Sequence, residues 1–277
     1  MSTATFPGGF SVLMAVWKGD SADLFKRALD SVYANTLRPD QVVLVVDGPV
    51  TDAIDSVIRT HVDAHGTEIL RLPHNQGLAK ALTAGIAHVR FEWIARADAD
   101  DVNLPTRFEW QARTVLADPA LDVTGGAIRE VDRDGSPIAV RRPPLTHAEI
   151  IRQLPSRSPL NHPAVAYRAE LARRVGGYPS LHLKEDYAMW CLFAKAGARF
   201  ANLDDVLVLA TAGRDMYRRR GGLRYIKSEI EMQRLMVRLE LKSRVAALLH
   251  GSARSLVFAM PGWVRGVVYR RLLRSGQ

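Results

Sequence analysis

Short apolar runs alternate with stretches of helical periodicity along the first hundred residues of the chain. The run at 41–46 is apolar without interruption, which is typical of a strand covered on both faces. Four strands are predicted, at residues 10–16, 41–46, 68–72 and 91–98. Three helices are predicted between them, at residues 23–34, 52–64 and 76–89, with Asn75 opening the third. This alternation predicts right-handed crossovers and an α/β fold, a Rossmann-like doubly wound and mostly parallel sheet.

The pattern is less regular after residue 100. We predict a helix at 104–116, a hairpin whose strands at 123–131 and 138–140 turn at Asp134-Gly135, a short helix at 146–153, a strand at 163–168 and an amphipathic helix that begins at Lys184. The proline-rich stretch from 143 to 163 marks a change between two halves, at 1–142 and 143–213. Residues 214–277 are predicted to form a basic, amphipathic helical extension.

The composition fits a single large domain with an appendage. The chain has 277 residues, of which 47% are hydrophobic, enough for a sizeable core. Its single cysteine, Cys191, stands in an apolar run, so we expect a buried structural thiol and no disulfide framework. Residues 1–10 do not form a signal peptide, and no apolar stretch reaches about 18 residues. We therefore expect a cytoplasmic location.

The positive charge is concentrated at the end of the sequence. The formal net charge is +9, but residues 214–277 alone carry +11 and the preceding residues about −2. Residues 223–249 have an amphipathic pattern, and residues 254–274 mix arginines with aromatic and aliphatic side chains. This pattern is typical of a helix lying on the anionic inner face of a membrane, and the alternative is a tail that docks on its own domain. Nucleic acid is not expected as a partner, because no binding motif is present.

Three carboxylates follow the fourth predicted strand within four residues. Asp98, Asp100 and Asp101 repel one another unless a cation lies among them, and Mg²⁺ or Mn²⁺ takes such oxygen ligands together with phosphates. The alternatives are a solvated turn or a helix N-cap. A calcium loop fits worse, because Val102 and Asn103 occupy positions where a ligand and glycine belong. Asp47 ends the second strand, so its carboxylate shares the same sheet edge, and this favours a metal-bound diphosphate site.

A second pair of acids, Glu185 and Asp186, stands at the predicted start of a helix. Acids in this place can complement the helix dipole. They can equally supply a general base that faces a cleft. Sequence spacing leaves both interpretations open.

The chain resembles the inverting family 2 glycosyltransferases of the GT-A fold, and among them bacterial enzymes of exopolysaccharide, capsule and O-antigen assembly. The resemblance covers nearly the whole length. It rests on Phe10-Ser-Val-Leu-Met-Ala-Val-Trp17, Val43-Leu-Val-Val-Asp-Gly48, Asn75-Gln-Gly-Leu78, Ala95-Arg-Ala-Asp-Ala-Asp-Asp101, Asn161-His-Pro163, Val175-Gly-Gly-Tyr178 and Glu185-Asp186. Ala15, Trp17 and Thr83 depart from the family's usual Pro, Tyr and Asn. The Gln-x-x-Arg-Trp element of processive members is absent, which favours the addition of one sugar per acceptor.

The resemblance implies a UDP-sugar donor in the half at 1–142 and an acceptor, a glycan on a lipid diphosphate, in the half at 143–213. Asp186 is then the expected base, with Glu185 second, and displacement inverts the anomeric carbon. Asp100 is the expected ligand of Mg²⁺ or Mn²⁺, with Asp98 and Asp101 beside it, and His162 is either a late ligand or a turn residue. The residues implied in nucleotide-sugar binding are Trp17, Asp47, Asn75, Gly77, Lys80, Arg96 and Asp98.

Several alternatives accompany these roles. Arg96 either contacts phosphate or forms a structural ion pair. The run Arg218, Arg219 and Arg220 either closes on the diphosphate or is a solvated basic segment. A catalytically inactive protein that binds glycolipid or nucleotide sugar would keep the same fold, although such proteins usually lose the metal acids. A nucleotidyltransferase fits poorly, because no glycine-rich phosphate loop follows the first strand.

Overall fold

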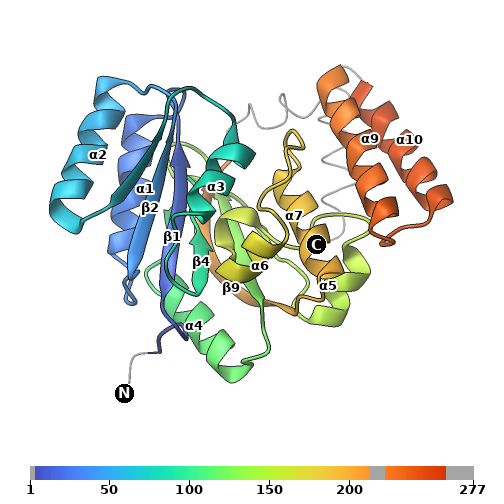
Figure 1. Cartoon of the computed structure of the whole chain (residues 1–277), viewed down its shortest axis with the longest axis horizontal. Helices are drawn as coiled ribbons and strands as arrows, with labels where there is room; N and C mark the ends of the chain where they lie inside the picture. Colours follow the sequence, from blue (N-terminus) through green and yellow to red (C-terminus); the bar gives the residue numbers. More distant parts are fainter. Residues whose placement is uncertain (1–3, 213–221, 260–277) are drawn as a thin grey trace.

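The computed structural model describes residues 4–212 and 222–259 of the chain (Figure 1). Strands and helices alternate through the first hundred residues, as the sequence predicts. The elements of this part are β1 (Phe10–Val16), α1 (Ala22–Tyr33), β2 (Gln41–Asp47), α2 (Asp52–His65), β3 (Glu68–Leu72), α3 (Leu78–Ile86) and β4 (Trp93–Arg96). Ser21 and Thr51 begin α1 and α2 by accepting a backbone N–H at the helix start, and β1 and β2 are buried at every position.

The second part of the chain completes the sheet and adds a helical layer. Its elements are β5 (Val102–Asn103), α4 (Arg107–Ala117), β6 (Val123–Val131), β7 (Pro137–Arg141), α5 (His147–Gln153), the 3₁₀ turn η1 (His162–Ala164), β8 (Ala166–Arg168), α6 (Ala169–Arg174), α7 (Glu185–Lys195), β9 (Phe200–Thr211), α9 (Leu223–Arg238) and α10 (Arg244–Ala259). The predicted hairpin is present as β6 and β7. The short helix α5 carries a capping box between Thr146 and Glu149.

The described strands form one nine-stranded sheet in the order β3-β2-β1-β4-β8-β6-β9-β5, with β7 paired to β6. The strands β1 to β4 pair in parallel, and β6 pairs in parallel with β9. The short strand β8 lies antiparallel between β4 and β6, so β6 and β9 point in the same direction as β4. The carboxyl ends of β1, β2, β4 and β9 therefore share one edge, which is where sheets of this kind bind ligands.

Helices cover both faces of this sheet. One core cluster packs α1, α2 and α4 against the strands, with Phe25, Ile54 and Phe108 fully or nearly fully buried. The other packs α3, α5, α6, α7 and α9 on the opposite face. Cys191 lies in this second cluster and is buried, as the sequence predicts, and burial raises the pKa of its thiol to about 12.

Several elements differ in extent from the prediction: β4 spans 93–96 instead of 91–98, α4 begins at Arg107 instead of residue 104, and α3 and β8 differ beside the site. The helix α3 begins at Leu78 instead of residue 76, because the N–H groups of Gln76 and Gly77 donate to the Asp47 carboxylate at 2.7 and 2.9 Å. The strand predicted at 163–168 is shortened to β8, since η1 occupies its first residues. In both places a turn near the site replaces regular structure.

The strand β9 was not predicted, although it is 12 residues long. Its pairing with β6 steps from Gly126–Leu203 to Ala127–Val206, so Asp204 and Asp205 bulge out of the ladder. Because these two acids interrupt the apolar pattern, the strand cannot be recognised from the sequence. The helix α7 is likewise more enclosed than the predicted amphipathic helix, because Tyr187 to Cys191 are all buried.

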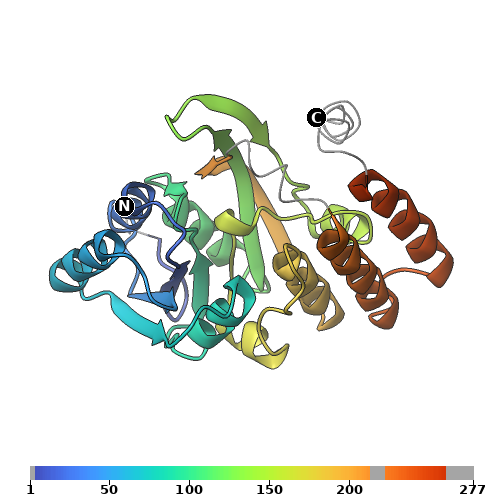
Figure 2. The same ribbon diagram turned by 90° about the horizontal axis from the view of Figure 1, so that it is seen from above.

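The end of the chain forms a helical hairpin beside α7 (Figure 2). The region predicted as one amphipathic pattern is divided into α9 and α10, and Glu240 takes a left-handed φ of 60° between them. Met232 and Met236 of α9 are fully buried in the core cluster that contains Trp190. The described part of the extension thus docks on the domain through α9, while residues 260–277 lie outside the described residues. Within residues 4–212 and 222–259, no helix is long and apolar enough to cross a membrane.

Candidate functional site

The acidic turn after β4 is fastened at the shared sheet edge. Asp101 is 6% exposed, and its Oδ1 accepts a 2.7 Å hydrogen bond from the N–H of Thr211 at the end of β9. The Thr211 hydroxyl donates to the carbonyl of Asp100. The strand β5, which follows the turn, pairs with β9 as well. The turn is therefore held between β4 and β9, and Asp101 is part of its framework.

Negative charge accumulates around Asp100. Loss of solvation by surrounding groups, then the carboxylates of Asp98 and Asp20, raise the pKa of Asp100 to about 6, although part of the residue still faces solvent. Asp20 belongs to the loop after β1 and was not among the predicted site residues. Its own carboxylate accepts from the N–H of Trp17 at 3.0 Å.

The donor atoms of this turn suit a hard divalent cation. Carboxylate oxygens are the preferred ligands of Mg²⁺, which is usually held by one or two of them and takes its remaining ligands from water and phosphate. Among the described residues, no three His, Cys, Asp or Glu side chains converge as a ready-made metal site. Asp98 and Asp100 thus offer a partial set of oxygen ligands, which fits an ion that also binds a diphosphate.

Arg96 ends β4 at the inner side of this turn and is fully buried. Its Nη2 donates to Oδ1 of Asp98, so the predicted ion pair exists. Its Nε and Nη1 have no hydrogen-bond partner among the described residues. An unpaired buried donor costs about 1–3 kcal/mol, so these two groups are a local cost at the end of β4.

A second buried arginine, Arg107 at the start of α4, supports the end of β4. Its Nη2 donates to the carbonyls of Arg96 at 2.7 Å and Val165 at 3.1 Å. Burial, and then the charge of Arg96, lower the pKa of Arg107 to about 9. The sequence offered one signal for this residue: Arg107 and Gln111 are polar residues one helical turn apart on a face that also carries Phe108, and Gln111 accepts from Nε at 3.2 Å.

His162 lies between the acidic turn and α7. Its Nε2 is 3.1 Å from the hydroxyl of Tyr178, and its ring meets Trp190 edge-on. Burial, then the charge of Arg96, lower the pKa of His162 to about 4, against the opposite effect of Asp98 and Asp186. The imidazole is therefore neutral near pH 7. It belongs to a hydrogen-bonded group with Tyr178, and its role as a metal ligand stays a prediction.

Glu185 and Asp186 occupy the first two positions of α7 and are half-buried. Burial, followed by the charge of Asp186, raises the pKa of Glu185 to about 7, and Asp98 contributes in the same direction. A carboxylate that only complemented a helix dipole would have its pKa lowered. The upward shift therefore favours the interpretation of a group that can exchange a proton near neutral pH. The charge of Asp98 in the acidic turn thus contributes to the electrostatic environment of the acid pair.

The predicted nucleotide-side residues Asp47, Asn75 and Gly77 come together at the end of β2. The two oxygens of Asp47 accept from Gln76 and Gly77, and the amide of Asn75 donates to the Asp47 carbonyl at 3.2 Å. Asp47 is 5% exposed, so it shapes this loop from within. Asn75 and Gly77 are exposed on it.

Three other predicted positions are less closely tied to the site. Trp17 is 44% exposed in the loop after β1, and its ring lies over Gly19, where a Cβ would meet it at 2.2 Å. Lys80 is exposed on the first turn of α3. Arg218, Arg219 and Arg220 lie outside the described residues.

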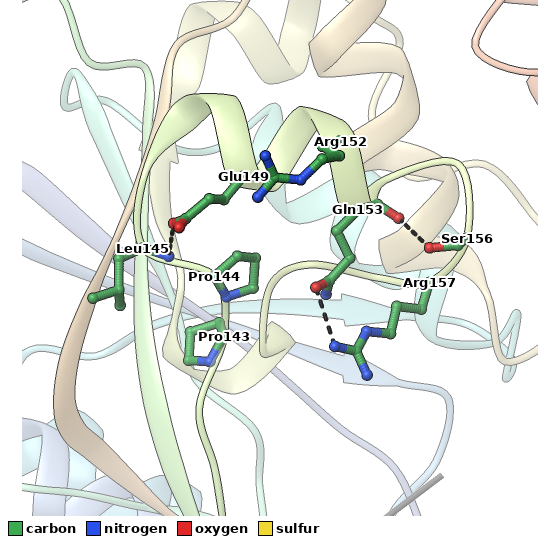
Figure 3. Close-up of a pocket in the computed structure, with 8 residues that line it drawn as sticks. All are labelled: Pro143, Pro144, Leu145, Glu149, Arg152, Gln153, Ser156 and Arg157. Carbon is green, nitrogen blue, oxygen red and sulfur yellow. Dashed lines mark hydrogen bonds between the residues drawn. The ribbon is translucent and has the colours of Figure 1, made fainter. Parts of the chain in front are cut away.

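A separate pocket of about 600 Å³ lies beside α5 (Figure 3). Pro143, Pro144 and the two arginines Arg152 and Arg157 line it together with polar residues. None of the predicted site residues contributes to this lining. The chemistry of the acids is therefore carried by the open sheet edge and not by this pocket.

A family model described as Glycosyl transferase family 2 matches residues 11–176, more than half of the chain. The amylovoran biosynthesis glycosyltransferase AmsE of Erwinia amylovora is 33% identical over 262 residues, which cover 95% of this chain and 98% of AmsE. The UDP-Gal:alpha-D-GlcNAc-diphosphoundecaprenol beta-1,3-galactosyltransferase of Escherichia coli is 32% identical over 265 residues, 96% of each chain.

Solved structures share the fold at lower sequence identity. Residues 1–349 of Staphylococcus aureus TarS, in complex with UDP-GlcNAc, superpose with a TM-score of 0.69 at 17% identity, covering 96% of this chain and 76% of that one. The mannosyltransferase PcManGT of Pyrobaculum calidifontis, in complex with GDP-Man and Mn²⁺, superposes with a TM-score of 0.63 at 18% identity, covering 97% and 81%. The doubly wound sheet is thus the fold of known sugar transferases.

Proposed function

Because the chain belongs to the family 2 glycosyltransferases, we propose that it moves one sugar from a UDP-sugar to a hydroxyl of a lipid-diphosphate-linked glycan in surface polysaccharide synthesis. The observation that carries this proposal is the placement of two acidic groups around one space. Asp98 and Asp100 belong to the turn after β4, and Glu185 and Asp186 to the start of α7, close enough for Asp98 to act on the pKa of Glu185. A relative whose name specifies a diphosphoundecaprenol acceptor supports the substrate class.

On the donor side, Asp100 and Asp98 hold Mg²⁺ or Mn²⁺, with Asp101 as the buried support of the turn. The bound ion supplies a Lewis acid that neutralises charge on the departing diphosphate. Arg96 offers its unpaired Nε and Nη1 to oxygens of the donor. His162 stays neutral and orients the Tyr178 hydroxyl, or it would serve as a further ligand of the ion. These roles use every group at the turn that carries unmatched charge or an unpaired donor.

On the acceptor side, Asp186 takes the proton from the attacking hydroxyl, and Glu185 is the second choice for this base. A sugar hydroxyl has a pKa far above 7, so it needs such a base within hydrogen-bond reach as it attacks. One base and one direct displacement invert the configuration at the anomeric carbon. The pKa of Glu185, about 7, suits a pair that exchanges protons at neutral pH.

The uridine lies at the ends of β1 and β2. Trp17 offers an exposed ring for stacking, and Lys80 offers a positive charge near the loop of Asn75 and Gly77. Since both Asp47 oxygens accept from the loop backbone, Asp47 contributes by fixing this loop. Arg218, Arg219 and Arg220 lie outside the described residues, so a contact between these arginines and the diphosphate stays a prediction from the sequence.

The enzyme acts as a peripheral protein on the inner face of the cell membrane, where its lipid-linked acceptor lies. Support comes from α10, whose Val245, Leu248, Leu249 and Leu256 are between 64% and 71% exposed. Leu248 and Leu249 follow Val245 by three and four residues, and Leu256 follows Leu249 by seven, so these side chains lie along one face of the helix and form an apolar stripe. The net charge of +11 on residues 214–277 favours an anionic lipid surface.

The proposal is tested by incubating purified protein and Mn²⁺ with a panel of UDP-sugars and an undecaprenyl-diphosphate-linked sugar acceptor. We expect UDP release and a one-sugar increase in acceptor mass with one donor, and loss of both on exhaustive chelation. Full activity after chelation would remove the metal from the proposal. Tight UDP-sugar binding without release or transfer, under every donor, would instead identify an inactive binding protein.

A further inference from the structure

The helix that carries the acid pair begins without the usual support at its first turn. Its N-cap residue, Lys184, makes no side-chain capping hydrogen bond. The preceding residue, Leu183, has a left-handed φ of 56° and is 39% exposed, so core packing does not explain this conformation. Such a backbone is costly for a leucine and persists where neighbouring contacts impose it. Those contacts come from α9.

Two residues of α9 hold the chain on either side of Leu183. The hydroxyl of Ser228 donates a 2.7 Å hydrogen bond to the carbonyl of His182. The carboxylate of Glu229 lies 2.8 Å from Nζ of Lys184. Both contacts are buried, since Ser228 and Glu229 are 1% and 0% exposed. The entry into α7 is thus fixed from the C-terminal hairpin, about 45 residues downstream.

The Lys184–Glu229 pair is enclosed by further groups of the hairpin. The amide of Gln233 donates to Glu229 at 2.7 Å, and Nζ of Lys184 lies 4.6 Å from the ring centre of Tyr225. Arg254 of α10 approaches Glu229 at 3.5 Å. Burial disfavours the charged carboxylate, but Lys184 and Arg254 outweigh it and lower the pKa of Glu229. Oε2 of Glu229 forms an ion pair with Lys184 but no hydrogen bond among the described residues, whereas Oε1 accepts from Gln233 and Arg254, so both oxygens of the buried carboxylate are held by opposite charge.

We infer that Glu229 is a positioning residue for transfer: through Lys184 it sets the direction in which the first turn of α7 presents Glu185 and Asp186 to the acceptor hydroxyl. The inference rests on the proposed function and adds to it a role for the C-terminal hairpin. The hairpin then completes the acceptor side of the active site, in addition to any contact it makes with lipid. The Lys184–Glu229 pair connects the hairpin to α7 and not to the acidic turn after β4, so we expect donor binding to be independent of this pair.

The test compares Glu229→Gln and Glu229→Asp in the full chain with a matched control. The control is Glu240→Gln, which breaks the exposed pair between Lys195, the last residue of α7, and Glu240, in the turn between α9 and α10. Because small displacements of a reacting group can cost about a hundredfold in rate, we expect kcat for Glu229→Gln to fall by roughly tenfold to a hundredfold. The donor KM and UDP affinity should stay within about twofold. Glu229→Asp should recover part of the rate, and Glu240→Gln should match the wild type.

A second variant covers the case in which Glu229→Gln does not fold. The double variant Lys184→Met and Glu229→Met replaces both charges with apolar groups of similar length, a change that buried ion pairs often tolerate. We expect it to fold and bind UDP normally but to transfer slowly. Transfer at the wild-type rate by either folded variant, or an equal loss in Glu240→Gln, overturns the inference. Absence of UDP release by the wild type with every donor overturns the proposed function instead, so the two failures are distinguished.

Discussion

The backbone N–H of Thr211 donates a 2.7 Å hydrogen bond to the carboxylate of Asp101, 110 residues earlier in the chain. This bond joins the last residue of β9 to the acidic turn after β4. It separates the three acids of the turn by role, since Asp101 is bound within the framework while Asp98 and Asp100 face the site. The position of the proposed metal ligands thus depends on a strand from the other half of the chain.

Asp101 is expected to matter first for folding. Asp101→Ala leaves the Thr211 N–H without its acceptor, so we expect a loss of about 1–3 kcal/mol in the free energy of unfolding. Asp101→Asn keeps a carbonyl oxygen for this N–H and should lose less. Urea denaturation of both variants measures the difference. Equal losses would contradict a role based on this hydrogen bond.

Asp100 is expected to matter for activity and not for stability. Asp100→Ala removes a carboxylate that is repelled by the carboxylates of Asp98 and Asp20, so the melting temperature should not fall. Transfer should be abolished, and Mn²⁺ binding in the presence of UDP should weaken strongly, as measured by calorimetric titration. Asp63→Ala, on the exposed side of α2, is the matched control. Normal Mn²⁺ binding by Asp100→Ala would assign the ion to other residues.

The acid pair predicts how the rate depends on pH. The pKa of Glu185 is raised to about 7, so the residue is protonated below that pH and charged above it. A charged Glu185 can accept a proton beside the attacking hydroxyl and a protonated Glu185 cannot, so transfer should rise with pH through about 7. In Glu185→Gln this rise should disappear, whereas Asp186→Asn should lower kcat by about a hundredfold or more at every pH. Near-normal transfer by Asp186→Asn would remove Asp186 from its role.

The same shift predicts an effect on stability. The folded-state pKa of Glu185 lies above its ordinary value of 4.5, so protonated Glu185 favours the folded state at low pH. That contribution is lost as the pH rises through about 7, where the carboxylate must ionise in a half-buried place. Glu185→Gln cannot ionise, so it should be more stable than the wild type at pH 8 and similar at pH 4. Thermal melts of both proteins at the two pH values test this prediction. A wild type with a higher melting temperature than Glu185→Gln at pH 8 would contradict it.

The apolar stripe of α10 predicts binding to anionic vesicles. Replacing both Leu248 and Leu249 by Asn removes two exposed side chains whose burial in lipid is worth about 1.5–3 kcal/mol each, so binding should fall by more than about tenfold. The melting temperature should not change. Leu116→Asn replaces a 49% exposed leucine of α4 and serves as the control. Cosedimentation with vesicles of mixed neutral and anionic lipid measures binding; equal binding by the double variant would rule out this face.

Elements with an uninterrupted apolar pattern could be predicted from the sequence. The strand β1 has the predicted bounds and the end of β2 differs by one residue, because buried parallel strands allow few polar positions. The strand β3 also has the predicted bounds, although it is only partly buried and contains Glu68 and Arg71. The strand β9 could not be predicted, since Asp204 and Asp205 interrupt it and only the pairing with β6 shows that they bulge outward. The break between α9 and α10 was missed as well, because Glu240 takes a left-handed conformation that usually calls for glycine or asparagine.

Some residues of the candidate site could likewise be predicted from the sequence, and others could not. The acids after β4 and at the start of α7 could be found from the sequence, because clustered carboxylates are conspicuous and lie at element ends. Arg107 and Asp20 escaped notice, since each is a single charged residue whose importance comes from neighbours distant in sequence. The sequence also did not show that both oxygens of Asp47 fix the following loop, because their partners are backbone N–H groups.

The burial of Met232 and Met236 in the main core restricts how the protein can be shortened. Removing all residues after 212 would remove the two methionines from the core cluster that contains Trp190. The apolar surface exposed in this way would be prone to aggregation. A shorter version intended for crystals should keep both helices of the hairpin through Phe258, whose ring packs on Tyr225, and trim only beyond it.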